Sequence, residues 1–255
     1  MHASRKPLIA GNWKMHYGGP AGVELAIACV RIAPKVPKVE LVIAPPFTAL
    51  AACAHECEGK GVAVAAQNFY PKDQGAFTGE VSAPMLKDAG CTWVIVGHSE
   101  RRQYFGETDA SVGEKTKVAI ASKLPPIVCV GETLAERESG KTLEVVRRQV
   151  AAFLDFIAEA PGVAAIAYEP VWAIGTGKTA GPAEAEEVHA AIRAQLADRL
   201  PEVAEKTRIL YGGSVKADNA KGLLGCANVD GALIGGASLD AASFGAIAEA
   251  AQGLT

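Results

Sequence analysis

Short apolar segments recur along the whole chain at a nearly even spacing of roughly 30 residues, and this repetition limits the possible folds more than any other feature. Eight such segments are bounded by turn-forming or charged residues, and each predicts a β-strand. They span residues 7–12, 40–44, 62–67, 93–96, 126–130, 164–169, 208–211 and 231–234. The segments between them have helical character, so strand and helix alternate from one end of the chain to the other.

Several predicted strands are apolar at every position. The run from Ile127 to Val130 does not alternate with polar residues, which is typical of parallel strands covered by helices on both faces. The chain has 255 residues, close to the roughly 250 that a closed (β/α)₈ barrel requires. No linker or change of composition divides it. We therefore predict an α/β fold with one domain, residues 1–255, forming a single (β/α)₈ barrel; an open, doubly wound parallel sheet is the alternative.

One connecting segment, residues 142–159, shows this helical character most clearly. Its apolar side chains recur at helical spacing. They are Leu143, Val146, Val150, Phe153, Leu154 and Ile157.

Charge and composition exclude several classes of function. The net charge is −3, and the basic residues are scattered rather than gathered in a stripe, so we expect neither a nucleic acid nor a membrane surface as partner. No segment approaches the roughly 20 apolar residues of a membrane span. The N-terminal region lacks the apolar core of a signal peptide. We therefore expect a cytoplasmic protein.

The six cysteines are spread along the chain without a Cys-x-x-Cys pair, which favours free thiols over a disulfide framework. Cys53, His55 and Cys57 are close in sequence, but in a helix His55 points away from the face that the two cysteines share. We predict no metal site and no cofactor.

Polar residues and glycine pairs follow five of the eight predicted strands, where a barrel of this kind has its active site. They are Asn12 and Lys14 after the first strand, His98 and Glu100 after the fourth, Glu169 at the end of the sixth, Gly212, Gly213 and Ser214 after the seventh, and Gly235 and Gly236 after the eighth.

Each of these residues has a structural and a chemical interpretation. Glycine pairs make tight turns, but they also let backbone N–H groups approach a phosphate. Glu169, at a buried strand end, is a candidate general base. His98 precedes a predicted helix, whose N-terminus favours a neutral imidazole that donates a hydrogen bond. Lys14 is either a solvated lysine or a cation for an anionic ligand. The shared position at strand ends favours the chemical interpretation for all of them.

The segment from Val171 to Lys178 carries apolar side chains beside a Gly-Thr-Gly tip, which predicts a lid that closes over the site. Gly175, Gly177 and Ala180 also match a loose dinucleotide-binding pattern, but that turn should directly follow its strand. A phosphate-loop NTPase motif fails because residue 172 is tryptophan rather than glycine.

The candidate groups at the strand ends are therefore one base, one neutral hydrogen-bond donor, one cation and a glycine-rich phosphate-binding site. No zinc-protease motif and no serine nucleophile elbow is present. This set suits removal of a proton next to a carbonyl group, with stabilisation of the enediolate that forms.

Seven segments together make the chain resemble the triosephosphate isomerase family over its whole length. They are GNWKM at 11–15, QGAFTGE at 74–80, VGHSERR at 96–102, CVGE at 129–132, YEPVWAIGTG at 168–177, YGGSV at 211–215 and GGAS at 235–238. The resemblance implies a cofactor-independent isomerase of glycolysis and gluconeogenesis, which interconverts dihydroxyacetone phosphate and D-glyceraldehyde 3-phosphate.

The same resemblance implies roles for individual residues. Glu169 would be the base, His98 the electrophile, and Lys14 a catalytic and substrate-binding cation. The other residues with implied roles are Asn12, Gly175, Ser214, Gly235 and Gly236 in substrate binding, and Glu100 and Gly213 in support of the site.

The family resemblance further implies a homodimer, in which residues 67–80 project toward a second copy. Thr78 would reach the partner's Asn12 and the partner's Lys14. Gln67, Met15, Glu80 and Arg101 would also belong to the interface. Two other functions stay open from the residues alone: an isomerase of a larger sugar phosphate, and a binding protein without catalytic activity.

Overall fold

The computed structural model describes residues 5–173 and 180–255, and every predicted strand is found in these ranges. Their bounds agree with the sequence analysis to within one residue. The strands are β1 (Leu8–Asn12), β2 (Glu40–Ala44), β3 (Val62–Ala66), β4 (Trp93–Val96), β5 (Pro126–Val130), β6 (Ala165–Tyr168), β7 (Arg208–Tyr211) and β8 (Gly231–Ile234).

The strands form a closed parallel barrel in sequence order. Closure occurs where β1 pairs with β8 as well as with β2: Leu8 lies opposite Gly231 on one side and opposite Glu40 on the other. The predicted (β/α)₈ barrel is thereby confirmed, and the open sheet is wrong.

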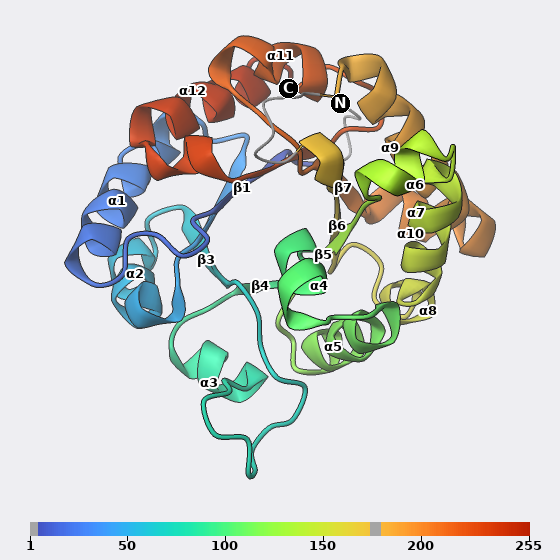
Figure 1. The fold of residues 1–255 in the computed structure, drawn as a ribbon. Helices are drawn as coiled ribbons and strands as arrows, with labels where there is room; N and C mark the ends of the chain where they lie inside the picture. The colour runs from blue at the N-terminus through green and yellow to red at the C-terminus, as the bar shows by residue number, and fades with distance from the viewer. Residues whose placement is uncertain (1–4, 174–179) are drawn as a thin grey trace.

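Helices surround the barrel on its outer side (Figure 1). They are α1 (Pro20–Val30), α2 (Leu50–Cys57), α3 (Ala83–Asp88), α4 (Ser99–Phe105), α5 (Asp109–Ala121), α6 (Leu134–Glu138), α7 (Thr142–Ala151), α8 (Leu154–Ala158), α9 (Pro182–Arg199), α10 (Pro201–Lys206), α11 (Ala217–Leu224) and α12 (Ala241–Gln252). Short 3₁₀ turns lie between some of them: η1 (Ala33–Lys35), η2 (Phe47–Ala49), η3 (Val171–Ala173) and η4 (Gly236–Leu239). No helix in the described ranges is long and apolar enough to span a bilayer.

Both faces of the strands are buried, as the uninterrupted apolar runs predicted. In β5, Ile127 and Cys129 belong to the cluster that fills the barrel, whereas Val128 and Val130 pack in the larger cluster between strands and helices. All four are at most 1% exposed. Because side chains alternate along a strand, this division also determines which residues beyond each strand face the barrel mouth.

The segment 142–159, predicted to have helical character, forms two helices, α7 and α8, with a break at Ala152 and Phe153. The carbonyl oxygen of Ala152 packs against Gly113 of α5. A Cβ atom at residue 113 would lie only 2.4 Å from this oxygen. The break thus permits a close approach of two backbones. Phe153 stays fully buried, which is why its apolar character fitted the helical pattern.

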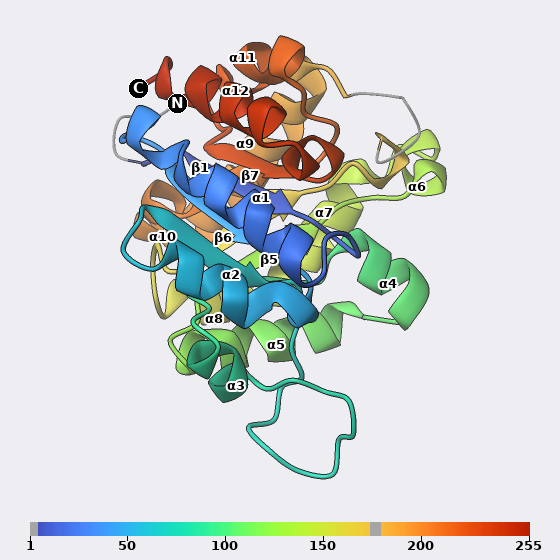
Figure 2. The ribbon, with the colours of Figure 1, turned by 90° about the vertical axis from the view of Figure 1, so that its left-hand side faces the viewer.

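The connection between β3 and α3 projects from the barrel as a long loop (Figures 1 and 2). Residues 72–80 within it are exposed. A loop of this length that projects from the surface buries little of its own backbone. Packing within the chain therefore does not explain it, and such loops are often functional.

Candidate active site

Strand alternation carries several predicted residues to the mouth of the barrel. Ala165 and Ala167 of β6 face the interior, so the next residue of the same phase, Glu169, reaches the interior at the strand's C-terminal end. The same argument applies to Asn12, the last residue of β1, and to Gly235, just beyond β8. Three distant parts of the sequence therefore meet at one end of the barrel.

A cavity of about 460 Å³ lies at this end. It is lined by Asn12, Lys14, His98, Glu169, Gly212, Gly213, Ser214, Val215, Lys216, Leu233, Gly235, Gly236 and Ala237. The structure thus brings together the predicted residues that follow β1, β4, β6, β7 and β8. Gly175, and most of the predicted lid, lie outside the described residues.

Lys14 has an unusual backbone conformation. Its φ of 52° is in the left-handed region, where a residue with a side chain is uncommon and strained. Hydrogen bonds hold it on both sides: its N–H donates to Asn12 Oδ1 at 3.0 Å, and its carbonyl accepts from Gln67 Nε2 at 2.8 Å. Such a strained position persists only where the surroundings fix it, and here it places the lysine at the cavity.

The ammonium group of Lys14 is paired with Glu100, with Nζ and Oε1 2.5 Å apart. The two side chains are 27% and 38% exposed, so the pair is partly solvated. The predicted supporting residue Glu100 therefore contacts Lys14 directly.

Glu169 is almost completely enclosed, with its side chain 3% exposed. Oε2 accepts the N–H of Ser99 at 2.9 Å, Oε1 accepts the Ser99 hydroxyl at 3.3 Å, and His98 Nε2 lies 3.0 Å from Oε1. Burial alone would raise the pKa of Glu169, but His98, the N–H of Ser99 and the cation of Lys14 outweigh it and hold the pKa below its ordinary value. The group is therefore a carboxylate at neutral pH, as a base must be.

His98 caps the N-terminus of α4, and its Nδ1 accepts the N–H of Glu100 at 3.3 Å. This hydrogen bond assigns the ring proton to Nε2, which faces the carboxylate. Burial lowers the pKa of His98, but the adjacent Glu169, helped by Glu100, raises it above its ordinary value overall. The prediction of a neutral ring considered the helix end alone, and it did not include a carboxylate in contact with the imidazole.

Two glycines packed against Glu169 are required by close approach. A Cβ at Gly212 would lie 2.8 Å from Cγ of Glu169, and one at Gly131 would lie only 1.7 Å from the carbonyl oxygen of Glu169. Neither position accommodates a larger residue without moving Glu169. These glycines fix the backbone from which the carboxylate projects.

Two residues near the site had no role in the sequence analysis. Ser99 provides the hydrogen bonds that hold Glu169, and Glu132, fully buried, accepts hydrogen bonds from Tyr168 and Trp172 at 3.2 and 2.9 Å. The signal available in the sequence for Glu132 was a carboxylate two residues after the buried strand β5. Its partners, by contrast, become visible only once β5 and β6 are placed side by side.

The residues predicted at a subunit interface differ in exposure. Met15 is 94% exposed, and Thr78 and Glu80 are exposed on the projecting loop. Gln67 and Arg101 are only partly exposed, and they also bind within the chain: Gln67 to the Lys14 carbonyl, and Arg101 to Glu107 at 2.6 Å.

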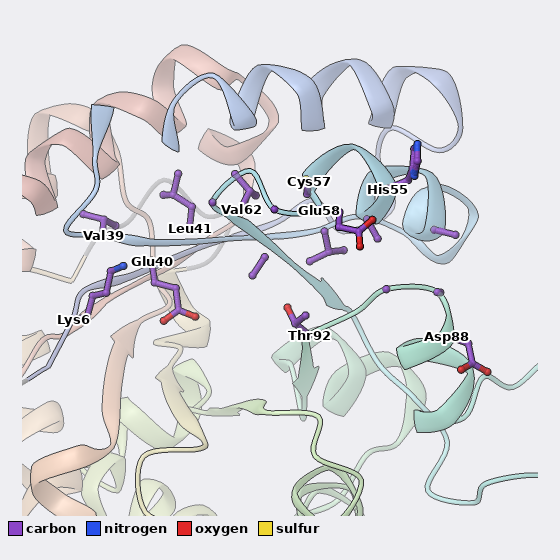
Figure 3. Close-up of a pocket in the computed structure, with 18 residues that line it drawn as sticks. Lys6, Val39, Glu40, Leu41, His55, Cys57, Glu58, Val62, Asp88 and Thr92 are labelled. Atoms are coloured by element: carbon purple, nitrogen blue, oxygen red, sulfur yellow. The ribbon is translucent and has the colours of Figure 1, made fainter. Parts of the chain in front are cut away.

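A larger cavity, of about 760 Å³, lies elsewhere, at the N-terminal ends of β2 and β3 (Figure 3). Lys6 and Glu40 lie at one end of it, and His55 and Asp88 at the other. In the described ranges no group of three or more His, Cys, Asp or Glu side chains is arranged to hold a metal ion. Size alone therefore does not identify the functional site.

Comparisons with known proteins agree with this geometry. The chain matches the protein family described as triosephosphate isomerase over residues 7–251. It is 54% identical to the triosephosphate isomerase of Moorella thermoacetica over 244 residues, which cover 95% of this chain and 98% of that protein. It is also 54% identical to that of Trichlorobacter lovleyi (95% and 98% covered) and 52% identical to that of Alcanivorax borkumensis (98% and 100% covered).

Proposed function

This chain belongs to the triosephosphate isomerase family, and we propose that its reaction, the interconversion of dihydroxyacetone phosphate and D-glyceraldehyde 3-phosphate, takes place in the cavity lined by Lys14, His98 and Glu169. The observation that carries this assignment is the convergence of a buried carboxylate, an imidazole, an ammonium group and the glycines of two adjacent strands on one cavity of about 460 Å³. The reaction moves hydrogen within one molecule, so it is redox-neutral and requires no external oxidant or reductant.

Glu169 is the base in this proposal. It removes a proton from the carbon next to the substrate carbonyl and returns it to the former carbonyl carbon, so that the carboxylate is regenerated. In the structure its oxygens are occupied by Ser99 and His98. The carboxylate therefore exchanges these contacts for the substrate when it acts.

His98 is the electrophile, because its Nε2–H is available to the oxygen on which negative charge develops. A substrate between His98 and Glu169 separates the two groups and removes the contact that raises the pKa of His98. Burial and the N-terminus of α4 then favour the neutral ring. A neutral donor stabilises the enediolate without first giving up its proton.

Lys14 adds positive charge beside the developing enediolate, and Asn12 and Glu100 support it: Asn12 binds its backbone and Glu100 its ammonium group. The backbones of Ser214, Gly235 and Gly236 hold the phosphate, with Gly213 supporting the turn; all of them line the cavity. Gly175, by the family resemblance, joins them when the lid closes.

The test of this function is isomerisation of dihydroxyacetone phosphate by the purified chain after dialysis against a chelator, followed through a coupled dehydrogenase. We expect rapid turnover that the chelator does not reduce. A folded wild-type protein without turnover would contradict the assignment. It would point instead to an isomerase of a larger sugar phosphate or to a binding protein without activity.

The same proposal includes a homodimer as the working form, in the cytoplasm. Seven of the large hydrophobic residues that the structure shows exposed lie on β1–β4 connections or the helices that follow them: Met15, Tyr17, Phe47, Phe77, Met85, Tyr104 and Phe105. Such a concentration on one side marks a protein interface. A second copy of the chain, bound through the projecting loop, covers this surface and completes the surroundings of Lys14.

Met15→Asp should weaken the dimer, because it replaces an apolar side chain of this surface that is 94% exposed with a charge. We expect the dimer dissociation constant to rise at least about 30-fold, with activity falling as the protein is diluted. Sedimentation and light scattering report the mass. Leu200→Asp is the control, since Leu200 is exposed between α9 and α10, far from this surface in sequence, and should leave the mass unchanged. A wild-type monomer with full activity would contradict the dimer proposal.

A further inference from the structure

The ionisable groups of the active-site cavity do not all have partners. Four such side chains line it in the described structure: Lys14, His98, Glu169 and Lys216. Lys14 is paired with Glu100, and His98 with Glu169. Lys216 is exposed, and within residues 5–173 and 180–255 its ammonium group has no ion pair. Among the side chains of the described residues, it contacts only Asn219 through a hydrogen bond, and Asn219 accepts from its backbone N–H at 2.8 Å.

The position of Lys216 relates it to the phosphate end of the cavity. It follows Ser214 and Val215, which also line the cavity, and it is the N-cap of α11. The cavity lining therefore includes a solvated positive charge that follows the glycine-rich segment Gly212–Ser214 in sequence. A phosphate monoester has close to two negative charges at neutral pH.

We propose that Lys216 is a second cation for the substrate's phosphate, which attracts the dianion into the cavity and contributes to its affinity. This inference rests on the proposed function. Lys14, already neutralised by Glu100 in the free protein, contributes little net field at the mouth before substrate binds. Lys216, without an ion pair in the described structure, provides that field.

A charge at the rim affects a reaction differently from a charge at the reacting atoms. It changes the rate of encounter and its salt dependence, whereas a group at the reacting atoms changes the chemical step. Because Lys216 is exposed, its attraction passes through solvent and is screened by salt. Its loss should therefore lower kcat/KM and leave kcat unchanged.

The experiment compares Lys216→Gln with wild type in steady-state turnover of D-glyceraldehyde 3-phosphate across ionic strengths, together with binding of glycerol 3-phosphate, an unreactive dianion of the same length. We expect kcat/KM and glycerol 3-phosphate affinity to fall about three- to tenfold at an ionic strength of about 0.01 M and less than about twofold at about 0.5 M. Lys216→Arg, which keeps the charge, should restore both.

Lys221→Gln is the matched control, because Lys221 is an exposed lysine of the same helix that does not line the cavity. If Lys216→Gln is indistinguishable from Lys221→Gln, the inference is wrong. A fall in kcat that salt does not reduce would also overturn it, because that result indicates a structural or chemical role. Wild-type protein that neither turns over nor binds glycerol 3-phosphate would defeat the proposed function itself, and the inference with it.

Discussion

Glu169→Gln should lower kcat by about 10² to 10⁴-fold, the usual contribution of a general base. Glutamine keeps the shape of the side chain and can still accept the N–H of Ser99, but it cannot take a proton from carbon. The pKa of Glu169 lies below its ordinary value, so the wild-type carboxylate is ionised throughout the neutral range. Glutamine does not titrate, so raising the pH should not restore activity to the variant.

The matched measurement is the affinity of Glu169→Gln for glycerol 3-phosphate, which has no proton to lose next to a carbonyl. We expect this affinity to remain close to that of wild type, because the phosphate end of the cavity is built from other residues. Turnover at the wild-type rate would exclude Glu169 as the base. Loss of both turnover and binding would instead indicate a damaged cavity.

Lys14→Met should lower kcat/KM by about 10² to 10³-fold, as expected for the loss of one group that stabilises charge in the transition state. Unlike Lys216, Lys14 should affect both KM and kcat. Methionine retains an unbranched side chain but leaves the Glu100 carboxylate without its partner at 2.5 Å. An unpaired negative charge then faces a negatively charged substrate, which adds to the loss.

Glu100→Gln separates the two contributions to the Lys14→Met effect. If Lys14 acts through its own charge, the Glu100 variant should lose much less activity, and the double variant should resemble Lys14→Met except for the part caused by the unpaired carboxylate. Unchanged KM and kcat in Lys14→Met would show that Lys14 is a surface residue. Melting curves establish that each variant is folded.

The strands and the convergence of the candidate site residues on one cavity could be predicted because their signals are local. Runs such as Ile127–Val130 are apolar on both faces only in a covered parallel strand, and the bounds of β5 follow from them. Once a strand is placed, side-chain alternation directs Glu169 and Gly235 to the barrel mouth. The site therefore needed no knowledge of tertiary contacts beyond the closure of the barrel.

Other features depend on contacts between distant segments, and the sequence contains no local sign of them. The left-handed backbone of Lys14 requires Gln67 from the third βα connection. The break between α7 and α8 depends on Gly113 in another helix. The raised pKa of His98 depends on the distance of 3.0 Å to Glu169. In each case a residue more than thirty positions away decides the local outcome.

The closure of the barrel by β1 and β8 also determines when activity arises during synthesis on the ribosome. Lys14 is made near the beginning of translation, but its Cε lies about 3.4 Å from where a Cβ of Gly235 would be, beside the last strand. A nascent chain that lacks β8 leaves one edge of β1 unpaired and lacks the cavity wall formed by Gly235 and Gly236. The proposed catalytic centre thus forms only after nearly the whole polypeptide has emerged, and the growing chain has an exposed strand edge until then.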